Sequence, residues 1–76
     1  MKYIVVSAPA GEAAVLFPRE FMHRWVADLF AMPVVAAGFV RETHAGLECH
    51  GRSAGLGIAA RPDHDTMLVA RALAGD

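Results

Sequence analysis

The sequence predicts an α+β fold with the element order ββαββα. Two observations carry this prediction: short β-branched or aromatic runs come in pairs separated by turn residues, and each pair is followed by an apolar stripe at helical spacing. The 76 residues make one small domain, residues 1–76. We expect a two-layer sandwich, with an antiparallel sheet of four strands, or five if residues 54–59 add another, and two helices on one face.

The first hairpin is indicated by the run from Lys2 to Ala8, which is short, β-branched and aromatic. Residues Pro9 to Glu12 have the composition of a turn, because proline presets φ at the first corner and Gly11 can adopt a positive φ. The returning strand is then Ala13 to Phe17.

The first helix is predicted after Pro18, because a proline in the first turn loses no hydrogen bond there. Apolar residues follow at steps of one, three and four and form one stripe: Phe21, Met22, Trp25, Val26, Leu29 and Phe30. The other side of this helix is polar: Glu20, His23, Arg24 and Asp28. We therefore place Trp25 in the core and end the helix at Pro33.

The second hairpin is predicted from a strand at Val34–Glu42, a turn at Thr43–Gly46 and a paired strand at Leu47–Arg52. Whether residues 54–59 form a fifth strand stays open, since nearby glycines weaken that segment and indicate a bulge or bend.

The second helix has Asp63 as its expected N-cap, with Asp65 in the first turn. Its apolar stripe is short: Leu68, Val69, Ala72 and Leu73. Gly75 is the expected C-terminal stop.

The strands at Ile4–Ala8 and Val34–Val40 carry apolar residues on both sides, which is typical of strands covered twice. Two helices on one face would leave the second face open. A second copy of the chain is the simplest cover, so we predict a homodimer. The alternative is that the small side chains of this face tolerate water.

Charge and cysteine content narrow the classes of partner. The net charge is −1 and the seven basic residues are scattered, so sequence-unspecific nucleic-acid binding is not expected, although the folded surface can still hold a small basic patch. The single cysteine cannot form an internal disulfide, which favours a reducing, cytoplasmic compartment. No apolar stretch approaches the length of a membrane span, so no membrane partner is expected.

The stretch "HAGLECHGRSAGLG", residues 44–57, has the residue types of a metal or catalytic site. Side chains of Cys49 and His50 point to opposite faces of a regular strand, so they cannot share one metal ion. We expect Cys49 to be a buried, inert thiol and the histidines to be solvated, with no metal and no cofactor. The alternative is a small metal- or ligand-binding module that uses His44, His50 and His64.

The same stretch lacks the surrounding scaffold and the sequence motif that catalysis or phosphate binding requires. The segment "GRSAG" around Ser53 loosely matches a nucleophile elbow, but the chain has no room for that scaffold or for a substrate pocket. The segment "GRSAGLG" matches neither glycine-rich phosphate motif, and the helix after it opens with Asp63 and Asp65, which repel anions. We therefore predict that the protein is not an enzyme.

A surface for protein recognition is predicted on the second hairpin. It would combine an aromatic residue with arginine and histidine, as in binding hot spots, and its members are Phe39, Arg41, Glu48, His50 and Arg52. It requires that Arg41 face the same side as Glu48, His50 and Arg52. The alternative is a solvated ladder of cross-strand charge pairs.

The segments "VVAAGFVR" and "CHGRSAGLGIAARPDHD" resemble a pattern in short uncharacterised proteins of proteobacterial prophages, over about half of the chain, Val34 to Asp65. The resemblance implies a small cytoplasmic accessory protein of a mobile element and carries over no catalytic residue. The surplus apolar surface of the strands and the missing catalytic geometry make a non-enzymatic, homodimeric protein-binding accessory factor the leading hypothesis. A nucleic-acid-binding accessory protein is a third hypothesis, which salt-dependent retention on DNA would support.

Overall fold

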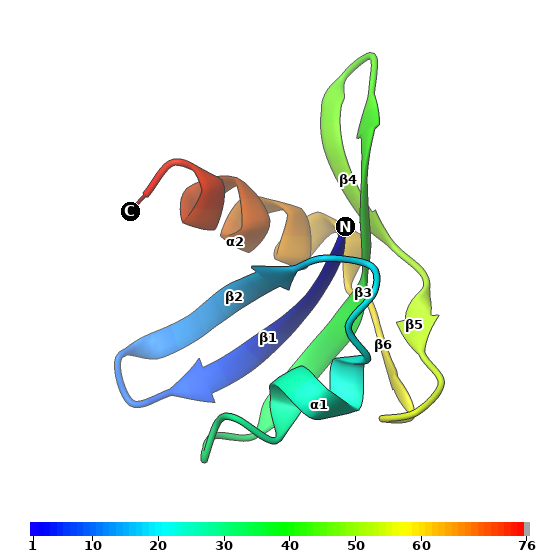
Figure 1. Cartoon of the computed structure of the whole chain (residues 1–76). Helices are drawn as coiled ribbons and strands as arrows, with labels where there is room; N and C mark the ends of the chain where they lie inside the picture. The colour runs from blue at the N-terminus through cyan, green and yellow to red at the C-terminus, as the bar shows by residue number, and fades with distance from the viewer. Residues whose placement is uncertain (76) are drawn as a thin grey trace.

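The computed structural model describes residues 1–75 and confirms the α+β class, with a four-stranded antiparallel sheet, a second small sheet and two helices (Figure 1). The elements and their bounds are β1 Lys2–Ala8, β2 Gly11–Phe17, α1 His23–Ala27, β3 Val34–Thr43, β4 Gly46–His50, β5 Arg52–Ser53, β6 Ile58–Ala59 and α2 Pro62–Leu73.

Two tight hairpins build the main sheet. Ala8 faces Gly11 where β1 meets β2, and Thr43 faces Gly46 where β3 meets β4. Each returning strand starts at a glycine with positive φ, 129° at Gly11 and 116° at Gly46, a conformation that other residues rarely adopt. Both predicted hairpins are confirmed, with β2 starting at Gly11 rather than Ala13.

The hairpins join through an antiparallel pairing of β1 with β3, so the strand order is β2-β1-β3-β4. This order places β1 and β3 in the centre and leaves β2 and β4 as edge strands. Residues 54–59 add no fifth strand to this sheet. Gly51 has a φ of 79° and turns the chain after β4, and the chain then forms the separate β5–β6 hairpin.

A register shift in the pairing of β1 with β3 interrupts the predicted alternation of side chains on β3. Val5 faces Ala36 but Val6 faces Val34, so Val35 is the extra residue of a bulge. Val35 and Ala36 therefore both pack in the core on the α2 side. Val34 packs with Val6 and Ala37 on the opposite side of the sheet, because a bulge reverses the alternation of side chains beyond it.

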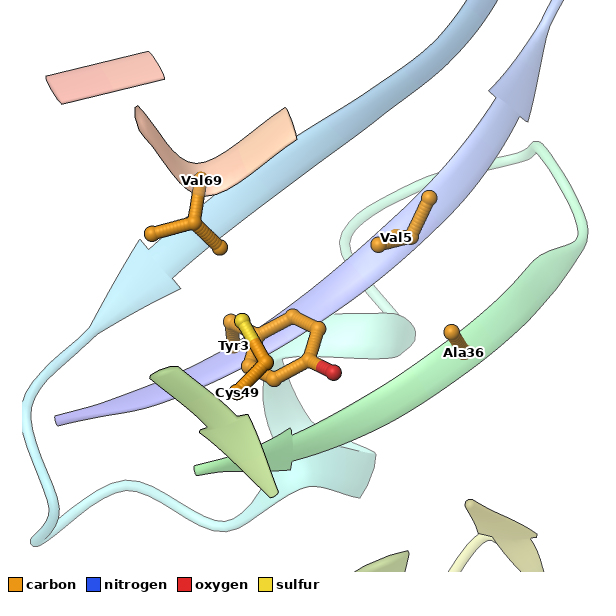
Figure 2. Packing of buried hydrophobic residues seen from close by; sticks show 5 residues of the cluster. All are labelled: Tyr3, Val5, Ala36, Cys49 and Val69. Atoms are coloured by element: carbon orange, nitrogen blue, oxygen red, sulfur yellow. The ribbon is translucent and has the colours of Figure 1, made fainter. Parts of the chain in front are cut away.

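The two helices cover opposite faces of the sheet, which corrects the expectation that both lie on one face. On one face, α2 packs over a core of Tyr3, Val5, Ala36, Cys49 and Val69 (Figure 2). On the other face, α1 and the β5–β6 segment cover a second core, formed by Ile4, Val6, Phe17, Val26 and Ala37. The chain thus covers both apolar faces by itself, and the argument that a second copy must do so no longer applies.

Helix α1 is shorter than predicted and buries a different side. It begins at His23, after Met22 in an extended conformation, and its buried residues are His23 and Val26. Trp25, expected in the core, has 60% of its surface exposed. A five-residue helix makes only a narrow contact, and the edge that faces the sheet is the one with His23 and Val26.

The start of α2 also differs from the expectation. Arg61 is the N-cap and Pro62 the first helical residue, so Asp63 lies inside the first turn. Asp65 lies in the first turn, as expected, and is fully buried. At the other end the expected stop is confirmed, since the helix ends at Leu73 and Gly75 has a φ of 81°.

Gly38 allows a close approach between β3 and the chain that follows β4. A Cβ atom at this position would lie 2.5 Å from the carbonyl oxygen of His50 and 3.1 Å from the Cβ of Ala60. Backbone at that distance must move to admit a side chain.

We therefore predict that Gly38→Ala lowers the free energy of unfolding by about 1–3 kcal/mol through overpacking. Urea denaturation followed by circular dichroism measures the change. The control is Gly55→Ala, where the added methyl group meets no atom within 4 Å. Equal stability of the two variants would contradict the prediction.

Candidate functional site

The structure brings together four of the five residues of the predicted recognition surface. Phe39 pairs with His50, and Arg41 pairs with Glu48, across β3 and β4. The rings of Phe39 and His50 have centroids 5.9 Å apart, and Arg41 Nε donates to Glu48 Oε1 at 2.7 Å. The Arg41–Glu48 ion pair is exposed, with 59% and 44% of the side-chain surfaces open to solvent. Such a pair contributes at most about 1 kcal/mol.

Arg52 lies outside this ladder, because Gly51 turns the chain between β4 and β5. It lies instead beside Phe39 at the rim of a hollow next to α1. We name this the basic hollow. Its volume is about 300 Å³ and it is lined by Lys2, Met22, His23, Arg24, Phe39, Arg52 and residues 53–55.

The alternative metal module gains no support from the fold. His44 lies in the turn between β3 and β4, His50 ends β4, and His64 bonds to Glu12 on β2. Among residues 1–75 there is no group of three or more His, Cys, Asp or Glu side chains that could hold a metal ion.

The two candidate nucleophiles are both buried. Cys49 has no exposed surface and lies in the core beneath α2 (Figure 2), where burial raises the pKa of its thiol. Ser53 is 2% exposed, and its hydroxyl accepts a hydrogen bond from the Leu56 amide at 3.2 Å. The expected buried thiol is confirmed, and Ser53 stabilises the β5–β6 turn.

His23 is the buried histidine that the sequence placed on the wrong side of the helix. Its Nε2 lies 2.9 Å from the carbonyl oxygen of Gly38, a distance at which it donates a hydrogen bond. Its ring packs edge-on between the rings of Phe17 and Phe39, 5.5 Å from each. This contact fixes α1 to the sheet, and His23 and Phe39 both line the basic hollow.

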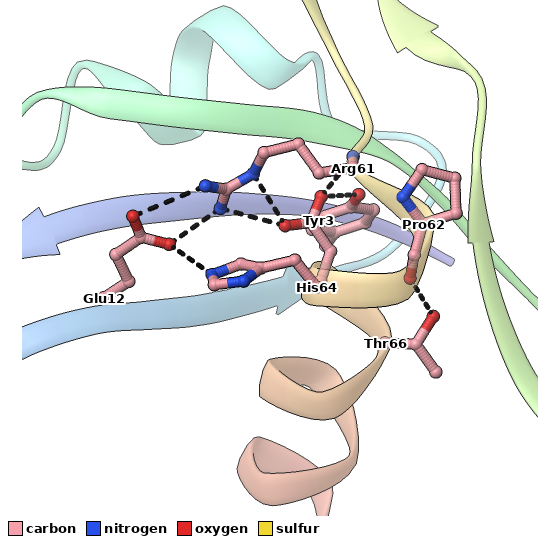
Figure 3. Close-up of polar contacts among 7 residues, drawn as sticks. Tyr3, Glu12, Arg61, Pro62, His64 and Thr66 are labelled. Carbon is pink, nitrogen blue, oxygen red and sulfur yellow. Dashed lines mark hydrogen bonds and ion pairs between the residues drawn. The ribbon is translucent and has the colours of Figure 1, made fainter.

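A polar cluster that sequence reasoning missed connects the first strand to the last helix (Figure 3). The Tyr3 hydroxyl donates to Asp65 Oδ2 at 2.5 Å, and the Arg61 amide donates to the same oxygen at 2.7 Å. Arg61 also donates from Nε to Asp65 Oδ1 at 3.1 Å and from Nη2 to Glu12 Oε1 at 2.8 Å. His64 Nε2 contacts that same Glu12 oxygen at 3.0 Å.

The environment of this cluster shifts three pKa values. Burial, and then the hydrogen bond to Asp65, raise the pKa of Tyr3 far above its ordinary value. Hydrogen bonds from Arg61 and His64 lower the pKa of Glu12, and the bond to Glu12 raises the pKa of Arg61. Asp65 is fully buried and every buried side-chain polar atom of residues 1–75 has a partner, so the burial of this carboxyl group is compensated where α2 meets β1.

Neither family models, curated proteins nor solved structures show a match to this chain. In residues 1–75 no helix has the length and apolar character needed to cross a membrane. The function is therefore inferred from the geometry of the residues themselves.

We predict that Tyr3→Phe lowers the free energy of unfolding by about 1–3 kcal/mol, because buried Asp65 loses a hydrogen-bond donor. Urea denaturation measures the loss. The control is Ser7→Ala, which removes an exposed hydroxyl from the same strand. Unchanged stability of Tyr3→Phe would show that the hydroxyl does not stabilise the fold.

The lowered pKa of Glu12 predicts a pH-dependent contribution to stability. The pKa of Glu12 is lower in the folded than in the unfolded chain, so ionised Glu12 stabilises the fold when the pH is above its ordinary pKa of 4.5. This stabilisation disappears as the pH falls through the folded-state pKa. In urea denaturation from about pH 6 to about pH 3, Glu12→Gln is expected to be less stable than the wild type at the upper end. The two should converge at the lower end, and a constant difference would contradict the assignment.

Proposed function

We propose that the protein is a non-enzymatic, protein-binding accessory factor that works as a homodimer, with two copies pairing along β2. The observation that carries this proposal is the composition of the open edge of the sheet. Strand β2 lies at the edge, and five consecutive residues from Ala13 to Phe17 are apolar.

An apolar edge strand without protection is a template for pairing with another strand. Protected edges carry lysine, proline or inward-pointing charges, and none of these occurs between Ala13 and Phe17. Ala13 is exposed, and Ala14, Val15 and Leu16 are only partly buried. Pairing with a second chain would bury these side chains and satisfy the outer backbone groups of the strand.

A second copy fits this edge because an antiparallel pairing of β2 with itself is compatible with a two-fold axis. A mostly apolar hollow of about 440 Å³ adjoins the end of β2 and is lined by Met1, Leu16, Phe17, Pro18, Arg19 and Leu73. Leu73 and Met1 are 54% and 51% exposed, so the dimer would also cover side chains that the monomer leaves open to water.

The outer face of α1 is the surface we assign to a partner protein. Trp25 lies on α1, with Met22 directly before the helix and Leu29 shortly after it, and these side chains are 60%, 49% and 79% exposed. Exposed apolar side chains gathered in this way favour contact with an apolar segment of a partner protein.

A reducing compartment fits the single buried thiol of Cys49, and the cytoplasm is the compartment we infer. Origin from a mobile element stays a prediction from the prophage-like segments.

The homodimer is tested with Ala13→Lys, which places a charge on the open edge of β2. We expect the wild type to sediment as a dimer at micromolar concentration and the variant as a monomer with an unchanged circular dichroism spectrum, because the edge charge opposes strand pairing. Analytical ultracentrifugation measures the masses.

The matched control is Ala45→Lys, which adds the same charge at an exposed position in the β3–β4 turn and should remain dimeric. A monomeric wild type would overturn the homodimer. A dimer that survives Ala13→Lys but dissociates on Trp25→Ser would place the contact on α1 and refute the assignment to β2.

A further inference from the structure

We propose that the basic hollow binds a phosphate group attached to a planar ring, as in a nucleoside monophosphate or one nucleotide of a single strand. This proposal goes beyond the homodimer and does not depend on it, because the hollow involves α1, β3 and β5 rather than the open edge from Ala13 to Leu16.

The first argument is the charge around the hollow. Three cations from segments far apart in the sequence line it: Lys2 from β1, Arg24 from α1 and Arg52 from β5. Of the described residues that line the hollow, none is acidic. Although the net charge of the chain is −1, this hollow is locally positive. Clustered cationic side chains of this kind bind phosphate groups.

The second argument is that these cations are positioned and still have donors to offer. Lys2 Nζ donates to the Phe21 carbonyl oxygen at 2.9 Å, and Arg24 Nη2 donates to the Gly55 carbonyl oxygen at 2.8 Å. Lysine has three donors and arginine five, so each keeps others for a ligand. Arg52 is exposed and forms no ion pair within residues 1–75.

The third argument is the apolar wall. Phe39 lines the hollow, and its ring is held at 5.5 Å from the His23 ring and 5.9 Å from the His50 ring. Gly51 lies against the same ring, since a Cβ atom there would come within 3.0 Å of Phe39. A ring fixed in this way beside Met22 is suited to pack against a planar group, and bases stack on aromatic side chains without strong sequence preference.

The size of the hollow limits the ligand. A volume of about 300 Å³ is at the lower end for ligand pockets, so it admits one ring with one phosphate rather than a dinucleotide. Two arginines at the rim favour phosphate over a single carboxylate, because the guanidinium group can donate to two phosphate oxygens together.

The experiment is isothermal titration calorimetry of the full chain with four probes: adenosine 5′-monophosphate, adenosine, inorganic phosphate and a short single-stranded oligodeoxyadenylate. Each is tested on the wild type and on Arg52→Gln, Phe39→Leu and Arg71→Gln. Arg71 is exposed on α2, on the other face of the sheet, and gives the same change of charge away from the hollow.

We expect adenosine 5′-monophosphate to bind more tightly than adenosine or phosphate, and Arg52→Gln to weaken it about tenfold through the loss of charged hydrogen bonds. Phe39→Leu should weaken it as well, and Arg71→Gln should not. Because Phe39 is partly buried, the folding of the Phe39→Leu variant is checked by circular dichroism. If that variant unfolds, the comparison of Arg52→Gln with Arg71→Gln still tests the proposal.

Binding of the oligonucleotide alone, weakened by Arg52→Gln but not by Arg71→Gln, supports the site with a polynucleotide as the source of the ligand. The proposal is overturned if neither nucleotide probe binds, if Arg52→Gln and Arg71→Gln weaken binding equally, or if inorganic phosphate binds as tightly as the nucleotide. None of these outcomes depends on the oligomeric state, so failure here leaves the homodimer untouched.

Discussion

The hydrogen bond from Tyr3 to Asp65 joins the two ends of the chain and determines how the rest of it is layered. Both side chains are fully buried, and an unpaired carboxyl group in that position would carry a large desolvation cost. Arg61 supplies the remaining donors and reaches on to Glu12, so the start of α2 is tied to β1 and β2 together. Helix α2 is thereby committed to one face of the sheet.

The opposite face is covered by much smaller elements. A five-residue helix is too short to be stable by itself, so α1 depends on its contacts with the sheet. His23 provides the most specific of these contacts, through the Gly38 carbonyl oxygen and the rings of Phe17 and Phe39. The β5–β6 segment completes the cover with Leu56 and Ile58. Each side of β1 thus has its own core, Tyr3 with Val5 on one and Ile4 with Val6 on the other.

The binding surfaces that we propose follow from the small size of the elements that cover this face and from the strand order of the sheet. Because α1 is short and buries His23 and Val26, Trp25 on the helix and Met22 and Leu29 beside it remain exposed. Because β1 is central and begins with Lys2, the same face receives cations from three separate segments around Phe39. The open edge of β2 is a third consequence, since β1 pairs with β2 on one side and with β3 on the other, and no other strand of residues 1–75 pairs with β2. These three features are the ones on which the proposed binding surfaces rest.

The sequence by itself determined the local elements: both hairpins, the stop of α2 at Gly75 and the buried Cys49. These depend on turn residues, strand alternation and cross-strand neighbours, all of which act over a few positions. Only the tertiary structure decided which side of α1 is buried, where the bulge at Val35 reverses the pattern, and that the two helices lie on opposite faces. Asp65 shows the reason, because its spacing from Arg61 is visible in the sequence whereas Tyr3 lies 62 positions away and only the packing of α2 on β1 brings it within reach.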